Sequence, residues 1–137
     1  MAHWLYPANT KFYDVLGAFA EDETYWPMNS KVATGDVIYV YLAVPHKQIG
    51  FVCEVLEIGF EEAAIIDKVR PFFKAPPDAK GKQKSFMKLQ TTKALELGFS
   101  AKVDYAHLKE NGLNGMLMGP RKLENNPELL AYIKGVL

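Results

Sequence analysis

The spacing of hydrophobic residues predicts short strands and short helices along the whole chain. Aromatic and β-branched residues favour strands at 3–6, 37–44 and 49–58, and partial alternation favours another at 85–97. Apolar residues recur at helical spacing over 11–20, where Asn9 or Thr10 is placed to cap a helix. A last helix is predicted from Pro127 to the end of the chain.

Glycine, proline and aspartate mark the connections between these elements. Residues 21–31 are polar and contain Pro27, so they predict a loop, and 74–84 predict a lysine-rich loop. Gly50, inside a strand pattern, indicates a bulge or a close approach by another backbone. Asp104 is placed to cap a short helix that Gly112 closes, and 61–73 could form another.

The order of these elements predicts a single α+β domain over residues 1–137. A chain of 137 residues can bury a hydrophobic core without metals or disulfides. Strands and helices do not alternate regularly, which argues against a doubly wound sheet. A curved sheet or small barrel flanked by helices is the natural way to bury these strands.

Composition excludes several classes of protein. One cysteine, Cys53, rules out an internal disulfide and a cysteine-cluster zinc site, and it is expected to be a small buried residue. No apolar run approaches the roughly 20 residues of a membrane span, and no secretory signal is visible, so a cytoplasmic location is expected. The three histidines lack carboxylates at metal-ligand spacing. We expect no metal, no cofactor and no catalysis.

A net charge of zero conceals two regions of opposite sign. Residues 14–62 contain nine acidic side chains and two lysines. Residues 68–93 carry eight basic side chains and one acidic side chain; the basic ones are Lys68, Arg70, Lys74, Lys80, Lys82, Lys84, Lys88 and Lys93. This basic block is what a polyanionic partner requires, although a solvated lysine-rich loop would have the same composition.

Trp26 stands in a polar segment just ahead of a strand, and two interpretations of it are open. Tryptophan is mostly well buried in proteins, which favours a core position. A protein that captures an extruded base needs an aromatic plane, hydrogen-bonding groups and positive charge. Trp26, followed by Asn29, Ser30 and Lys31, supplies all three from one short segment.

Taken together, several segments resemble the EVE domain, a member of the PUA-like superfamily related to ASCH and YTH domains. They are "HWLYPANTKFYD", the spaced set Trp26, Gly35-Asp36 and Tyr41, then "IGFVCEVLE", "GMLMGPRKL" and "ELLAYI". The resemblance implies a compact pseudo-barrel of mixed, mainly antiparallel strands flanked by short helices. It also implies a free-standing, non-enzymatic reader of DNA or RNA in which a modified base is flipped into a pocket.

Carried over by position, the resemblance implies a set of site residues. The base would meet Trp26, Asn29, Ser30, Pro7, Ala8, Asn9, Tyr41 and Leu42. The charge pattern adds Lys31, Lys80, Lys82 and Lys84 as candidate phosphate contacts. Two alternatives stay open: a hydrolase of the ASCH type acting on a small molecule or nucleoside, and a protein partner of a restriction-type nuclease.

Overall fold

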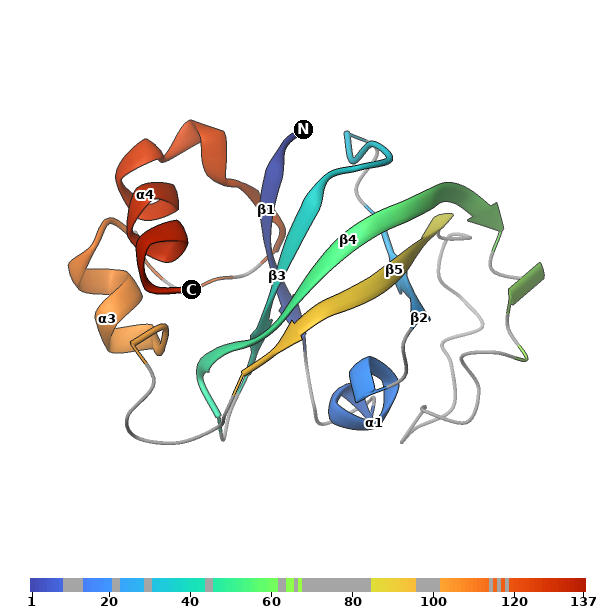
Figure 1. The fold of residues 1–137 in the computed structure, drawn as a ribbon, viewed down its shortest axis with the longest axis horizontal. Coiled ribbons are helices and arrows are strands. Elements are labelled where there is room, and N and C mark those ends of the chain that lie inside the picture. The colour runs from blue at the N-terminus through green and yellow to red at the C-terminus, as the bar shows by residue number, and fades with distance from the viewer. Residues whose placement is uncertain are drawn as a thin grey trace.

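The fold is a mixed sheet with short helices on both sides (Figure 1). This computed structural model describes residues 1–8, 14–20, 23–28, 31–43, 46–61, 64–65, 67, 85–95, 102–113, 115, 117 and 119–137. Its strands run in the order β2-β5-β4-β3-β1-β6, with β1 and β3 parallel and the other pairs antiparallel. The predicted α+β class is confirmed, and the sheet is open, with β2 and β6 at its edges.

The elements are short and follow one another closely. In chain order they are β1 (His3–Ala8), α1 (Val15–Ala20), β2 (Glu23–Pro27), β3 (Val37–Leu42), β4 (Gln48–Glu61), β5 (Ser85–Ala94), α3 (Tyr105–Glu110), β6 (Arg121–Lys122), the 3-10 helix η2 (Leu123–Asn125) and α4 (Pro127–Val136). In the described part of the chain, no helix is both long and apolar enough to cross a membrane.

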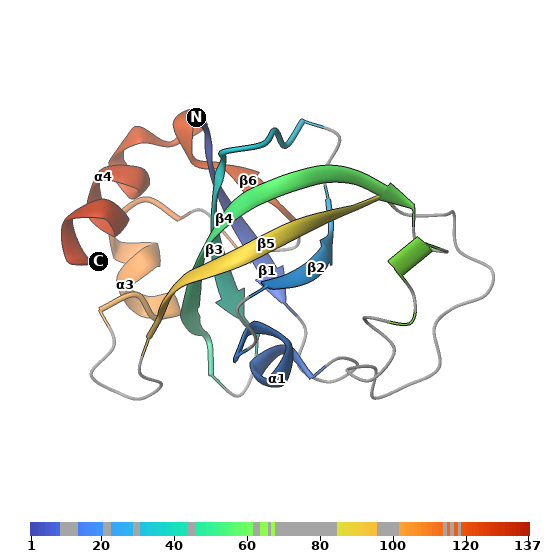
Figure 2. The ribbon, with the colours of Figure 1, turned by 45° about the vertical axis from the view of Figure 1, so that its right-hand side comes forward.

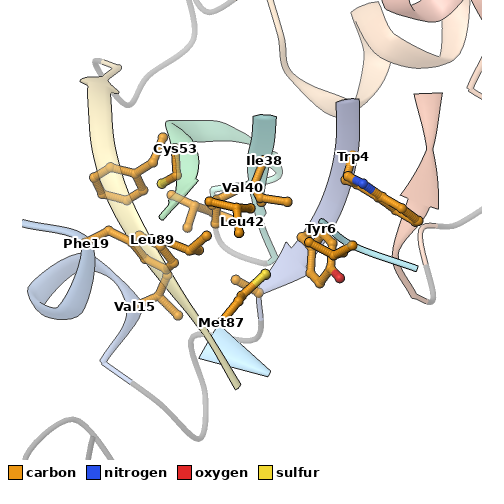
Figure 3. Close-up of a cluster of buried hydrophobic side chains, with 14 residues drawn as sticks. Trp4, Tyr6, Val15, Phe19, Ile38, Val40, Leu42, Cys53, Met87 and Leu89 are labelled. Carbon is orange, nitrogen blue, oxygen red and sulfur yellow. The ribbon is translucent and has the colours of Figure 1, made fainter. Parts of the chain in front are cut away.

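Alternating side chains divide the core between the two faces of the sheet. One cluster, here called the α1-side cluster, contains Trp4, Tyr6, Ala8, Val15, Phe19, Val32, Ile38, Val40, Leu42, Phe51, Cys53, Val55, Met87 and Leu89 (Figure 3). A second, the α4-side cluster, contains Leu5, Tyr39, Tyr41, Ile49, Val103, Leu108, Leu113, Leu123, Leu129 and Ile133, and a small third cluster contains Tyr25, Ile65 and Phe86. Figures 1 and 2 show α3 and α4 together on one side of the sheet and α1 away from them.

Gly50 confirms the predicted irregularity in β4. The register passes from Val40–Phe51 to Tyr41–Ile49, so Gly50 is the extra residue of a β-bulge. A Cβ at this position would lie 2.5 Å from Cδ1 of Leu42. Glycine therefore lets the buried Leu42 side chain pack directly on the bulged strand.

Most of the predicted elements are confirmed, with shifted ends. The strand predictions match β1, β3, β4 and β5, and the final helix begins at Pro127. Asp104 caps α3 by accepting a hydrogen bond from the His107 amide at 2.9 Å, and Gly112 has a φ of 117°. Of the predicted helix over 61–73, the residues described beyond β4 are 64, 65 and 67, and their backbone is helical. Residues 74–84 lie outside the described ranges.

Two local predictions need correction. Residues 23–27 are not loop but form β2, in which Trp26 pairs with Met87 of β5. An edge strand tolerates Pro27, which has no amide to donate, and its partner strand comes from a distant part of the chain. The helix α1 begins at Val15, because Asp14 is not helical and its side chain accepts a hydrogen bond from the Gly17 amide at 3.1 Å. The predicted caps Asn9 and Thr10 and the predicted helical residues 11–13 lie outside the described residues.

Candidate functional site

Trp26 is partly buried and lies at the border of the α1-side cluster. It packs against that cluster from the edge strand β2. Its ring contacts Phe19 of α1, with ring centroids 5.2 Å apart and planes inclined by 49°. Phe19 in turn stacks on Phe51 of β4 at 5.3 Å and 26°. Trp26 is therefore the outermost of three rings, supported by the core and still partly open to solvent.

Ala8 and Leu42 lie on the face of the sheet against which Trp26 packs. They are register partners in β1 and β3, and both are fully buried in the α1-side cluster. Tyr41 belongs to the α4-side cluster, because consecutive residues of a strand face opposite sides. Pro7, its register partner, is half-buried. The structure therefore does not bring Tyr41 and Trp26 to one face.

The polar part of the predicted site falls mostly outside the described residues. Asn9, Asn29, Ser30, Lys80, Lys82 and Lys84 all lie in undescribed segments. Lys31 is described and exposed, five positions after Trp26. Lys88, from the basic block, forms an ion pair with Glu23 across β2 and β5, with Nζ 3.1 Å from Oε2. The hydrogen bond to this carboxylate raises the pKa of Lys88, and the pair neutralises its charge locally.

Asp36 is a structural centre that the sequence did not reveal. Its buried carboxylate accepts hydrogen bonds from the Ala2 amide at 2.9 Å, the Trp4 indole at 3.0 Å and the Ala33 amide at 2.9 Å. Burial acts to raise the pKa of Asp36, but these hydrogen bonds favour the charged form and the net shift is downward. Asp36 thus holds the segment that follows Lys31 close to β1.

Two histidines and the cysteine in the described part of the chain have structural partners. His3 Nδ1 lies 2.7 Å from a Glu124 carboxylate oxygen, and His107 Nδ1 lies 2.6 Å from Asp104. Burial raises the pKa of the Cys53 thiol to about 12, although a hydrogen bond with Thr91 acts to lower it. Cys53 is therefore a protonated, buried residue, as predicted. Among the described residues, no three His, Cys, Asp or Glu side chains gather as metal ligands.

Comparison with known proteins identifies the fold. No family model and no curated protein matches the sequence. The ASCH protein of Zymomonas mobilis superposes with a TM-score of 0.62 at 12% identity, over 94% of each chain. A Pseudomonas syringae protein of structural-genomics origin gives 0.66 at 14% identity, over 98% of each chain. Human THYN1, crystallised with DNA containing 5-methylcytosine, gives 0.51 at 13% identity, over 80% of this chain and 74% of THYN1.

These likenesses define the class of the protein at the level of its fold. The open mixed sheet with a few short helices is the PUA-like fold of ASCH proteins and THYN1. The fold is therefore shared with these proteins, whereas the predicted membership of the PUA-like superfamily and the narrower resemblance to EVE domains stay predictions.

Proposed function

We propose that this chain is a nucleic-acid-binding module that receives a modified base, such as 5-methylcytosine in DNA, against the exposed part of Trp26. The observation that carries the proposal is the position of Trp26, partly exposed at a sheet edge and supported from behind by Phe19. The fold adds support, because human THYN1 shares it and was crystallised with DNA containing 5-methylcytosine.

The energetics require more than the aromatic surface. Stacking a base on an aromatic side chain contributes about 1–3 kcal/mol. Extruding a base from a duplex costs a few kcal/mol, and less from a single strand. Stacking and extrusion therefore nearly cancel, and net affinity has to come from polar contacts to the base edge and the phosphates. Asn29 and Ser30, which follow Trp26 in the sequence, are the candidates for the base edge.

Burial of an added methyl group sets the scale of the preference for a modified base. The partly buried apolar side chains packed against the α1-side cluster include Ala2, Trp26 and Met28. Removing one methyl group completely from water contributes about 0.8 kcal/mol, which corresponds to roughly a fourfold change in affinity. We therefore expect methylated strands to bind up to about fourfold more tightly than unmethylated ones.

Substitution of Trp26 tests the proposal. Trp26→Ala should abolish binding to an oligonucleotide containing 5-methylcytosine, whereas Trp26→Phe, which keeps a flat ring, should retain part of it. Leu130→Ala is a matched control, because Leu130 is also partly buried but packs on the α4-side cluster. Unchanged binding in Trp26→Ala would refute the stacking role. A collapse of folding in Trp26→Ala alone would instead assign Trp26 to the core.

Lys31 is the described residue that we propose as a phosphate contact. Each phosphate neutralised by a lysine makes the logarithm of the affinity fall with the logarithm of salt concentration, with a slope change of about 0.9. Lys31→Ala should therefore weaken binding to all strands alike and reduce the salt slope by about one. Equal slopes for wild type and variant would remove Lys31 from the interface.

We infer that the module acts by binding and not by catalysis. Supporting this, the Cys53 thiol is buried with a pKa of about 12, and both His3 and His107 are engaged with carboxylates. Incubation of modified oligonucleotides and nucleosides with the protein, followed by chromatography, tests the inference. Recovery of the starting material is expected, and a new product that depends on the protein would favour an ASCH-type hydrolase.

A further inference from the structure

Phe19 contacts the ring of Trp26 from inside the protein. Its side chain projects from α1 into the α1-side cluster and is 1% exposed (Figure 3). Trp26 meets it at a tilt of 49°, so the two rings are not stacked face to face. Phe51, which is 7% exposed, stacks on Phe19 from the sheet. Phe19 therefore connects the partly exposed ring of Trp26 to the rigid core.

Phe19 is held in place by its backbone as well as by its ring. Its carbonyl oxygen accepts a hydrogen bond from the Thr91 hydroxyl of β5 at 3.0 Å. Val15, one helical turn earlier, is buried in the same cluster. The start of α1 is fixed by Asp14, whose carbonyl and carboxylate accept the Ala18 and Gly17 amides. The position of Phe19 is thus set by both α1 and β5.

Trp26 lies on an edge strand. Among the described strands, β2 has five residues and pairs with β5. Pro27, the next residue, has no amide to donate to a neighbouring strand. The two faces of β2 have different ring partners, because Trp26 packs on Phe19 whereas its neighbour Tyr25 packs on Phe60.

We propose that Phe19 is a positioning residue for base binding: its ring holds Trp26 in the orientation that a base stacks on. This proposal rests on the proposed function. A side chain already held in its bound orientation loses less conformational freedom when the ligand arrives. Ordering a released Trp26 side chain on binding should weaken affinity roughly two- to tenfold. Phe19 would exert this effect without touching the nucleic acid.

The test compares the same substitution at two buried phenylalanines. Phe19→Leu removes the ring behind Trp26, whereas Phe86→Leu removes a ring that is 5% exposed and packs in a cluster with Tyr25, on the opposite face of β2 and β5. We expect Phe19→Leu to bind a 5-methylcytosine oligonucleotide roughly two- to tenfold more weakly than Phe86→Leu, after both are shown to be folded. Phe19→Met, whose flexible side chain adapts to an irregular space, replaces Phe19→Leu if the latter does not fold. Equal affinities in the two variants would overturn the proposal.

A second measurement does not depend on any ligand. Iodide quenches exposed tryptophans, and Trp26 is the more exposed of the two, since Trp4 is 3% exposed. Quenching should increase in Phe19→Leu and stay at the wild-type value in Phe86→Leu. If wild type binds no modified strand while quenching behaves as expected, the proposed function fails and the packing role of Phe19 stands. If wild type binds the modified strand but quenching is unchanged in Phe19→Leu, only the positioning role of Phe19 is refuted.

Discussion

Replacing Asp36 by asparagine should strongly destabilise the protein. The buried carboxylate accepts three hydrogen bonds, from the amides of Ala2 and Ala33 and from the indole of Trp4. Asparagine keeps one acceptor oxygen and puts an N–H₂ group where the second oxygen was. In Asp36→Asn, the amide oxygen can take the Oδ2 position and keep the bonds from Ala33 and Trp4, so the N–H₂ group replaces Oδ1 and faces the Ala2 amide, which is itself a donor.

The hydrogen bonds to Asp36 determine how far the free energy of unfolding should fall. A hydrogen bond to a charged group contributes about 1.5–3 kcal/mol, and a buried donor left without an acceptor is costly. One such bond is lost at the Oδ1 position, from the Ala2 amide at 2.9 Å, and the bonds from Trp4 at 3.0 Å and Ala33 at 2.9 Å lose their charged acceptor. We expect the free energy of unfolding to fall by about 3–5 kcal/mol, which is a large part of the 5–15 kcal/mol typical of a domain.

Urea unfolding followed by tryptophan fluorescence measures this loss. With a slope of about 2 kcal/mol per molar urea, the midpoint should fall by about 2 M. Glu54→Gln is the matched control, because Glu54 lies exposed on β4 and the change removes the same charge. A midpoint for Asp36→Asn within about 0.3 M of that control would refute the structural role of Asp36.

Three further predictions concern residues whose packing or hydrogen bonds the structure defines. Gly50→Ala should lower the free energy of unfolding by about 1–3 kcal/mol, because the added Cβ meets Leu42 at 2.5 Å, and an unchanged urea midpoint would contradict the packing at the bulge. Cys53, with a pKa of about 12, should resist iodoacetamide at pH 8 until urea unfolds the chain, and rapid labelling of the native protein would contradict its burial. The pKa values of Asp36 and Glu124 are lowered in the folded protein, since their hydrogen bonds outweigh the opposing effect of burial. Their stabilisation should therefore be complete above the unfolded pKa values of about 4 and be lost as the pH falls through the lower folded values. Urea midpoints measured between pH 6 and pH 3 should decline below about pH 4, and Asp36→Asn should flatten part of that decline.

Elements with local signals could be predicted from the sequence. The β-branched and aromatic residues of β3 and β4 determine strands by themselves, and the Asp104 cap with Gly112 fixes both ends of α3. β2 could not be found in this way. Its residues are polar around Trp26, and their strand conformation depends on pairing with β5, far along the chain. Tertiary pairing overrides local preference at such an edge.

The candidate site was predicted in part. Trp26 was singled out from its residue type and its polar neighbours. Phe19 and Asp36 were not, because the contacts that define them join distant segments, such as Asp36 with Trp4, 32 positions apart. Strand alternation alone predicts that Tyr41 and Leu42 face opposite sides of the sheet, which argues against placing both in one pocket.

The central claim is that Trp26 distinguishes a modified base from an unmodified one. Competition binding of two otherwise identical oligonucleotides, one with 5-methylcytosine and one with cytosine, measures this most directly, in DNA and RNA versions and as single and double strands. We predict that wild type prefers one methylated form by up to about fourfold and that Trp26→Ala loses the preference. Equal affinity of wild type for methylated and unmethylated strands in every version would contradict this claim. General electrostatic attraction would then be sufficient to explain binding.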